Sequence, residues 1–140
     1  MWLEKVTRLP GAETGAPAEA AAIGACEQAL GHPLPEQLKD FLLAADGVTG
    51  EWGEGVLWPA AQIAESNREF RTTPDFRELY MPFDPLIFFA DSGDGSQYAL
   101  LRGIDRLDVF RWDHETDSRL WVASSLPDYL DRLAAGSLEG

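Results

Sequence analysis

The second half of the chain contains four short runs of strand-forming residues whose connections are too short to hold a helix. The runs are LIFFA (86–90), SQYALL (96–101), LDVFRW (107–112) and RLWVA (119–123). A parallel pair of strands needs a crossover of a dozen or more residues, whereas an antiparallel pair needs only a tight turn. We therefore predict a mainly antiparallel, hairpin-linked sheet over residues 86–123.

The first third of the chain has the spacing of two helices joined by a short proline-containing turn. Pro17 suits the first position of one helix, and Gly31 suits its C-cap. Pro35 can open the second helix, which Gly47 ends. The core-facing stripe of this second helix follows i, i+3, i+4, i+7 spacing and consists of Leu38, Phe41, Leu42 and Ala45.

Two further helices are predicted, one on each side of the strand-rich region. Pro59 can start a helix whose inner face consists of Ile63, Asn67 and Phe70. Near the C-terminus, Ser125 is a favourable N-cap, with Asp128 three residues further on. Residues 71–85 contain three prolines and are expected to be irregular. This order of elements predicts an α+β fold in which the sheet packs against the N-terminal helices and a C-terminal helix.

The length of 140 residues and the hydrophobic content of 45% predict a single domain over residues 1–140 with its own core. Residues 1–16 are expected to form an extended or irregular N-terminal segment. The single cysteine, Cys26, excludes an intrachain disulfide and is expected to be a small buried apolar residue. The charged start and the absence of a run of about 18 apolar residues predict a cytoplasmic protein without a signal peptide.

The stretch FADSGDGSQYALL (89–101) could be a metal loop, a phosphate loop or a hairpin. Calcium loops of the EF-hand type need oxygen ligands at fixed positions, and counting from Asp91 puts glycines and an arginine at those positions. The glycine spacing also departs from both phosphate-binding patterns. The S-G and D-G pairs instead favour a turn between two strands. We predict a hairpin, with no metal ion and no cofactor.

The candidates for a catalytic residue are isolated from one another. His32 lies in the helix-helix turn, and His114 lies in the polar turn DHETDS between two strands, where we expect it to be solvated. No G-x-S-x-G pattern is present, and Ser124 and Ser125 are explained by helix capping. We therefore predict no catalytic residues and a protein that is not an enzyme. A small hydrolase that uses a pair of carboxylates remains an alternative.

The charge balance is strongly acidic. Asp and Glu total 24 against 11 Lys and Arg, which gives a net charge of -13. Such a surface repels phosphate groups, so nucleic acids and anionic membranes are not expected partners. The acidity could serve solubility alone, or it could attract a basic protein partner.

The tryptophans fall into two groups. Trp58 and Trp121 lie in strand-like runs and, with Phe88 and Phe110, are predicted to contribute to the core. Trp52 instead lies in the segment GEWGEG, between acidic residues and glycines. It could be an exposed protein-binding hot spot with an acidic rim, or it could fold back and cover the core.

The order and spacing of several segments resemble those of the SUKH superfamily. The segments are LPEQLKDFLLAADG (34–47), VLWP (56–59), the helix with Asn67, MPF (81–83), DSGDGSQYAL (91–100), VFRWDHET (109–116) and SSLPDYL (124–130). The chain has G-D-G where members often carry a G-G pair, and Asp46-Gly47 where Asn-Gly is usual. The superfamily includes a fungal regulator of cell-wall synthesis and many bacterial immunity proteins. The resemblance implies an α+β fold and no established catalytic centre.

These observations together predict a non-catalytic protein-binding module, an immunity protein that binds and neutralises a toxin, possibly a basic nuclease domain. A regulatory or scaffold protein of the same fold is the alternative. Composition and motifs specify no oligomeric state. The predicted contact residues are acidic or aromatic and lie on the glycine-rich loop and the two hairpin turns; they are Glu51, Trp52, Glu54, Asp91, Asp94, Asp113, Glu115 and Asp117. The two hairpin turns need not lie at the same end of the sheet, but successive hairpins alternate ends, so the intervening turn allows the two to coincide.

Overall fold

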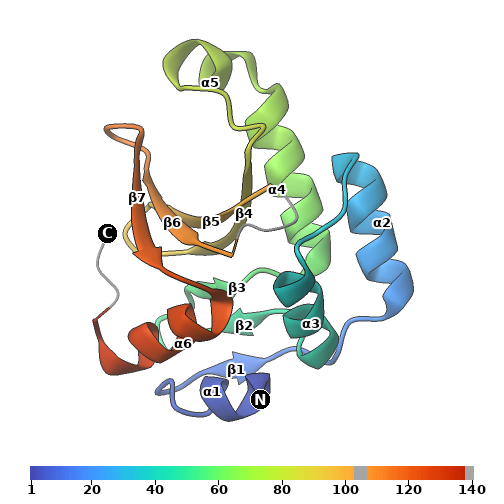
Figure 1. The fold of residues 1–140 in the computed structure, drawn as a ribbon, viewed down its shortest axis with the longest axis vertical. Coiled ribbons are helices and arrows are strands. Elements are labelled where there is room, and N and C mark those ends of the chain that lie inside the picture. Colours follow the sequence, from blue (N-terminus) through green and yellow to red (C-terminus); the bar gives the residue numbers. More distant parts are fainter. Residues whose placement is uncertain (103–106, 138–140) are drawn as a thin grey trace.

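Four antiparallel strands form the larger of two sheets in the computed structural model, which describes residues 1–102 and 107–137 (Figure 1). Their order in the sheet is the order in the chain, so every connection within the sheet joins neighbouring strands. Each strand coincides with one of the predicted runs. The strands are β4 (Leu86–Asp91), β5 (Gln97–Leu101), β6 (Val109–Asp113) and β7 (Ser118–Ala123).

A smaller sheet of three short strands lies beside the larger one. It consists of β1 (Glu13–Thr14), β2 (Val48–Thr49) and β3 (Gly55–Leu57) in that order. The backbone N–H of Trp58 donates to the carbonyl of Phe89 over 2.8 Å, which joins the end of β3 to β4. Of these three strands the sequence indicated only β3, through the strand-like run that ends at Trp58, because a strand of two residues is too short to show alternation.

The four predicted helices are confirmed. Gly31 ends the first with a left-handed φ of 79°, although this helix begins at Ala20 rather than at Pro17. Ser125 caps the last by accepting a hydrogen bond from the N–H of Asp128. The described residues contain α1 (Trp2–Val6), α2 (Ala20–Leu30), α3 (Glu36–Ala44), α4 (Ala60–Thr72), α5 (Pro74–Leu79) and α6 (Leu126–Ala135). None of the helices in this part of the chain combines the length and the apolar composition needed to cross a membrane.

Helices occur in two segments where none was predicted: residues 1–16, expected to be extended or irregular, and residues 71–85, expected to be irregular. Residues 1–16 contain α1 and β1, because Trp2 is buried and stacks on Phe41 of α3 with ring centroids 4.8 Å apart. Residues 71–85 contain α5, which begins at Pro74. The prediction failed there because proline is unfavourable inside a helix but favourable in its first turn, where its missing N–H costs nothing.

The main aromatic cluster lies between α4, α5 and the four-stranded sheet. Phe88 and Trp112 are buried in it, and their ring centroids are 5.7 Å apart. Trp58 is also buried, as predicted, and Phe110 is partly buried. Trp121 was wrongly assigned to the core: its exposed fraction is 46%, because β7 is an edge strand.

The outer edge of β4 is closed by a side chain of α4. Asn67 is fully buried, and its Nδ2 donates to the carbonyls of Ile63 and Phe88 over 2.7 and 2.8 Å. Its Oδ1 accepts from the N–H of Phe88 over 2.8 Å. Buried backbone groups at a sheet edge need such partners. Asn67 therefore holds α4 and β4 together and orients the hairpin that follows β4.

Candidate functional site

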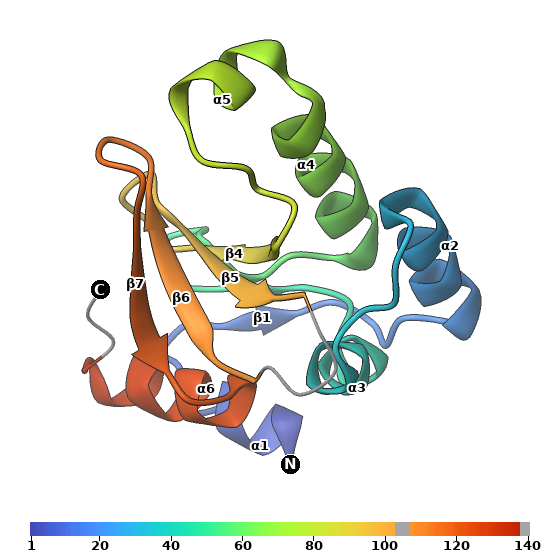
Figure 2. The same cartoon turned by 45° about the horizontal axis from the view of Figure 1, so that its top comes forward.

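Three of the predicted contact segments meet at one end of the molecule, which we call the acidic end. They are the loop 50–54 between β2 and β3, the turn 92–96 between β4 and β5, and the turn 114–117 between β6 and β7. A side chain at Gly93 would touch Glu54 at 3.9 Å, and one at Gly95 would meet the His114 ring at 3.0 Å. Both hairpin turns project from the same end of the sheet, at the upper left of Figure 2. The sequence left open whether these two turns lie at the same end, and the structure places them together.

The turn 92–96 has the hairpin geometry predicted from its glycines, since Gly93 and Gly95 have φ values of 91° and 97°. The Asp94 carboxylate organises it by accepting hydrogen bonds from the Ser92 hydroxyl and the Ser96 N–H, and it pairs with Arg111 of β6. These hydrogen bonds, followed by the Arg111 charge, lower the pKa of Asp94 to about 2. Asp94 thus stabilises the turn while its side chain remains largely exposed.

The turn 114–117 is also held by a carboxylate. Asp117 adopts a left-handed φ of 57° and accepts hydrogen bonds from Trp112 Nε1 and the Met81 N–H over 2.8 and 3.0 Å. Burial by itself would raise the pKa of Asp117, but these bonds and the nearby Arg119 charge lower it. Asp117 is therefore already engaged within the fold.

His114 is packed rather than solvated, contrary to the prediction. Its ring is half-buried and lies against Trp112, with centroids 6.4 Å apart, and Nδ1 is buried without a hydrogen-bond partner among the described residues. The cause is the adjacent hairpin, because Gly95 leaves room for the ring. Of the acidic residues in this turn region, Glu115 is exposed, and half-buried Asp113 accepts from its N–H over 2.9 Å.

Trp52 extends into solvent at the tip of loop 50–54. Its exposed fraction is 84%, so the alternative in which it covers the core is wrong. The Glu54 carboxylate accepts from the Trp52 N–H over 3.1 Å, and the Gly50 N–H donates to the Glu54 carbonyl over 2.8 Å. These bonds give the loop a defined shape. An indole held this far into water is the kind of side chain that becomes a hot spot when a partner covers it.

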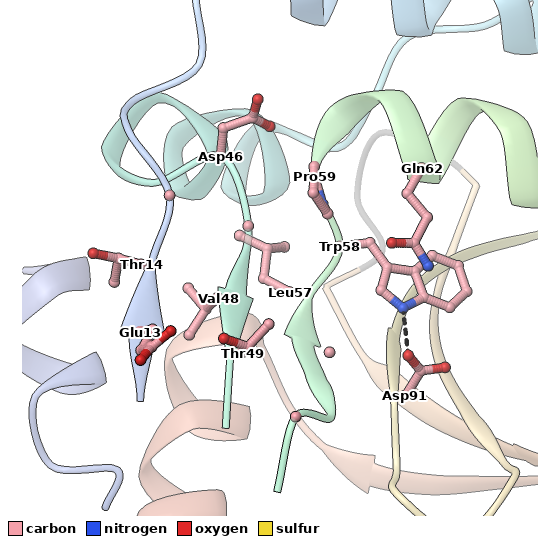
Figure 3. Close-up of a pocket in the computed structure, with 14 residues that line it drawn as sticks. Glu13, Thr14, Asp46, Val48, Thr49, Leu57, Trp58, Pro59, Gln62 and Asp91 are labelled. Carbon is pink, nitrogen blue, oxygen red and sulfur yellow. Dashed lines mark hydrogen bonds between the residues drawn. The ribbon is translucent and has the colours of Figure 1, made fainter. Parts of the chain in front are cut away.

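A cleft of about 520 Å³ lies between the smaller sheet and the start of α4 (Figure 3). Asp91 lies on one side of it and accepts from Trp58 Nε1 over 2.8 Å. On the other side, Asp46 accepts from the Ala60 N–H over 2.8 Å and so caps α4. The cleft was not predicted, because its walls come from segments far apart in the sequence.

The described residues contain no group of three or more His, Cys, Asp or Glu side chains placed to hold a metal ion. None of the Asp and Glu side chains in residues 1–102 and 107–137 is fully buried.

The structure brings the eight predicted contact residues to one region but gives them different surroundings. Asp91, Asp94 and Asp117 have hydrogen-bond partners within the fold, whereas Glu51, Trp52 and Glu115 are exposed.

Comparison with known proteins supports the resemblance found in the sequence. The family model described as the SMI1 / KNR4 family (SUKH-1) matches residues 17–132. The chain belongs to this family. A search of curated proteins found no match. Two of the resembling positions are structural in this SUKH-1 protein, since Asp46 caps α4 and Asn67 binds the edge of β4.

Proposed function

We propose that this SUKH-1 protein is a non-catalytic binding module of the immunity type, which binds and neutralises a toxin domain through its acidic end. A basic toxin, such as a nuclease domain, is the partner that the charge favours. The observation that carries the proposal is the exposed Trp52 among carboxylates drawn from three separate segments. A central aromatic anchor with a charged rim is a common arrangement in protein interfaces.

The charge of the acidic end favours a basic protein over other partners. Arg111 and Arg119 are paired with Asp94 and Asp117, whereas Glu51 and Glu115 are exposed and have no ion pair to another described residue. Uncompensated surface charge speeds the encounter with an oppositely charged protein. The same charge repels nucleic acid and anionic membranes.

A regulatory or scaffold role is the second candidate, because much of the acidity also serves the fold. Asp94, Asp117 and Asp128 each stabilise a turn or a helix end within the chain. In that case the net charge serves stability and solubility, and the acidic end has no toxin partner.

The decisive experiment is co-expression with any toxin domain that a neighbouring gene is found to encode, followed by calorimetric titration of the purified pair. We expect survival of the cells and a complex whose association rate falls with added salt. Trp52→Ala should weaken binding about 30-fold, as for a hot spot worth about 2 kcal/mol. Leu79→Ala, which removes another exposed apolar side chain on α5, is the control and should leave binding unchanged. Full toxicity in the presence of the protein would exclude this pairing.

A further inference from the structure

A small pocket beside Trp52 has the composition of a receptor for one basic side chain. It has a volume of about 150 Å³ and lies between loop 50–54, the start of the β4–β5 turn, and α6. Its apolar walls include Leu9, Val56 and Leu133, and its acidic residues are Glu51, Glu54 and Asp91. Sites for whole cofactors or substrates usually enclose about 300–1,000 Å³. A single extended side chain is therefore the better match in size.

The acidic residues of this pocket differ from the others at the acidic end. Asp94 and Asp117 have arginine partners, but Glu51, Glu54 and Asp91 form no ion pair with any described residue. Glu54 and Asp91 both contribute, after burial and the neighbouring Tyr98, to raising the pKa of Tyr129. Their charges are thus close enough to act on one hydroxyl. Like charges held together without a counter-ion favour the arrival of a cation.

Tyr98 provides an independent observation. It lines the pocket and is only 6% exposed, yet its hydroxyl makes no hydrogen bond with any residue that the structure describes. This oxygen is not among the fully buried polar atoms without a partner, so it keeps contact with solvent and can accept a hydrogen bond from a ligand. The neighbouring Tyr129 hydroxyl is instead satisfied within the fold, since it donates to the Val56 carbonyl over 2.9 Å. The nearest cross-strand cation, Arg111, is bound to Asp94. A hydrogen-bond donor on a ligand would give the Tyr98 hydroxyl oxygen a partner.

We propose that this pocket receives a lysine or arginine side chain of the protein partner, an inference that rests on the proposed function. The aliphatic stem packs against the apolar walls, because long basic side chains bury their methylene groups readily. The cationic head donates to Glu54, Asp91 and the Tyr98 hydroxyl. Trp52 at the mouth covers the stem or contacts the cation through its ring.

The pocket can be tested without a partner by NMR titration of the full chain. The probes are n-butylammonium for a lysine side chain and n-propylguanidinium for an arginine side chain, with n-butanol as the uncharged control. We expect saturable shifts of the amides of residues 50–56, 91 and 92, with a Kd of about 1 mM, for at least one cation and not for n-butanol. Equal shifts with n-butanol, or non-saturating shifts over the whole acidic surface, would overturn the proposal.

Variants identify the groups that bind the probe. Glu54→Gln and Asp91→Asn keep an acceptor for Trp52 and Trp58, and each should weaken cation binding about tenfold. Tyr98→Phe keeps the ring and should weaken it about threefold. Glu65→Gln, an exposed change of equal charge on α4, should alter it less than twofold. Unchanged affinity in Glu54→Gln and Asp91→Asn would refute the assignment.

The two proposals can fail separately. If the cation probes bind but no toxin does, the proposal of a cation pocket stands and the proposal of an immunity function is refuted. If a toxin binds wild type and Glu54→Gln equally, the immunity function remains and the pocket is not part of the interface.

Discussion

Replacing Asn67 with alanine should destabilise the protein more than its small change in volume suggests. The side chain is fully buried and makes three hydrogen bonds of 2.7–2.8 Å, two of which satisfy the N–H and C=O of Phe88. Alanine leaves both backbone groups buried without a partner. Each orphaned group costs about 1–3 kcal/mol, so the free energy of unfolding should fall by about 2–6 kcal/mol.

Asn67→Asp tests the same reasoning through pH. One carboxylate oxygen can still accept from Phe88, but the other faces the carbonyls of Ile63 and Phe88 and must be protonated to donate to them. The introduced acid should therefore have a folded pKa above its unfolded value of about 3.9. A raised pKa stabilises the fold below the unfolded pKa, and this stabilisation is lost as pH rises through the folded pKa. The variant should be weakest at neutral pH and recover on acidification.

Chemical unfolding at pH 7 and pH 5 measures both effects as shifts in the denaturation midpoint at constant m-value. Gln62→Ala is the control, since it removes an exposed amide from the same helix and should change stability by less than about 0.5 kcal/mol. Two results would refute this role of Asn67 at the edge of β4. One is a loss in the free energy of unfolding below about 1 kcal/mol for Asn67→Ala. The other is a destabilisation of Asn67→Asp that does not change with pH.

Three further predictions concern other parts of the fold. Gly55→Ala should destabilise the protein by about 1–3 kcal/mol, because the added Cβ would lie 2.8 Å from the Trp58 ring. The Cβ of Gly24→Ala in α2 meets nothing within 4 Å, so this variant should stabilise the protein by about 0.5–1 kcal/mol. Thermal melts compare the two variants, and equal effects would contradict the steric argument. Burial lowers the pKa of His32, whose Nε2 lies 2.9 Å from Arg71, so the neutral ring stabilises the fold and this contribution should fade as pH drops below the unfolded pKa of about 6.5. The stability of His32→Gln should therefore depend less on pH between pH 7 and 5 than that of wild type. The same pH dependence in both proteins would contradict this role of His32. Asp117→Ala should lower stability by about 1–3 kcal/mol, because Trp112 Nε1 and the Met81 N–H lose their acceptor. Chemical unfolding measures this loss, with Glu115→Ala, which changes an exposed residue of the same turn, as the control. Similar losses in both variants would show that the turn does not depend on the Asp117 carboxylate.

The candidate site was predicted in composition but not in arrangement. The sequence identified the loop and turns and allowed the two hairpin turns to coincide, since the number of strands between them determines which end each occupies. It gave no indication that loop 50–54 joins them, because Glu54 and Gly93, which lie near each other there, belong to connections of two different sheets. The pocket beside Trp52 could not be predicted either, since its walls come from the N-terminal segment, both sheets and α6.

The sequence by itself determined the elements whose signals are local. Runs of strand-forming residues with short connections dictated the antiparallel sheet, and Ser125 with Asp128 defined the start of α6, because turns and caps depend on residues only a few positions apart. Only the tertiary structure decided which tryptophans are covered. Trp2 is buried because Phe41 lies against it, and Trp121 is half-exposed because no described strand follows β7 in the sheet. Burial depends on neighbours that folding brings from distant parts of the chain, and residue type alone does not specify those neighbours.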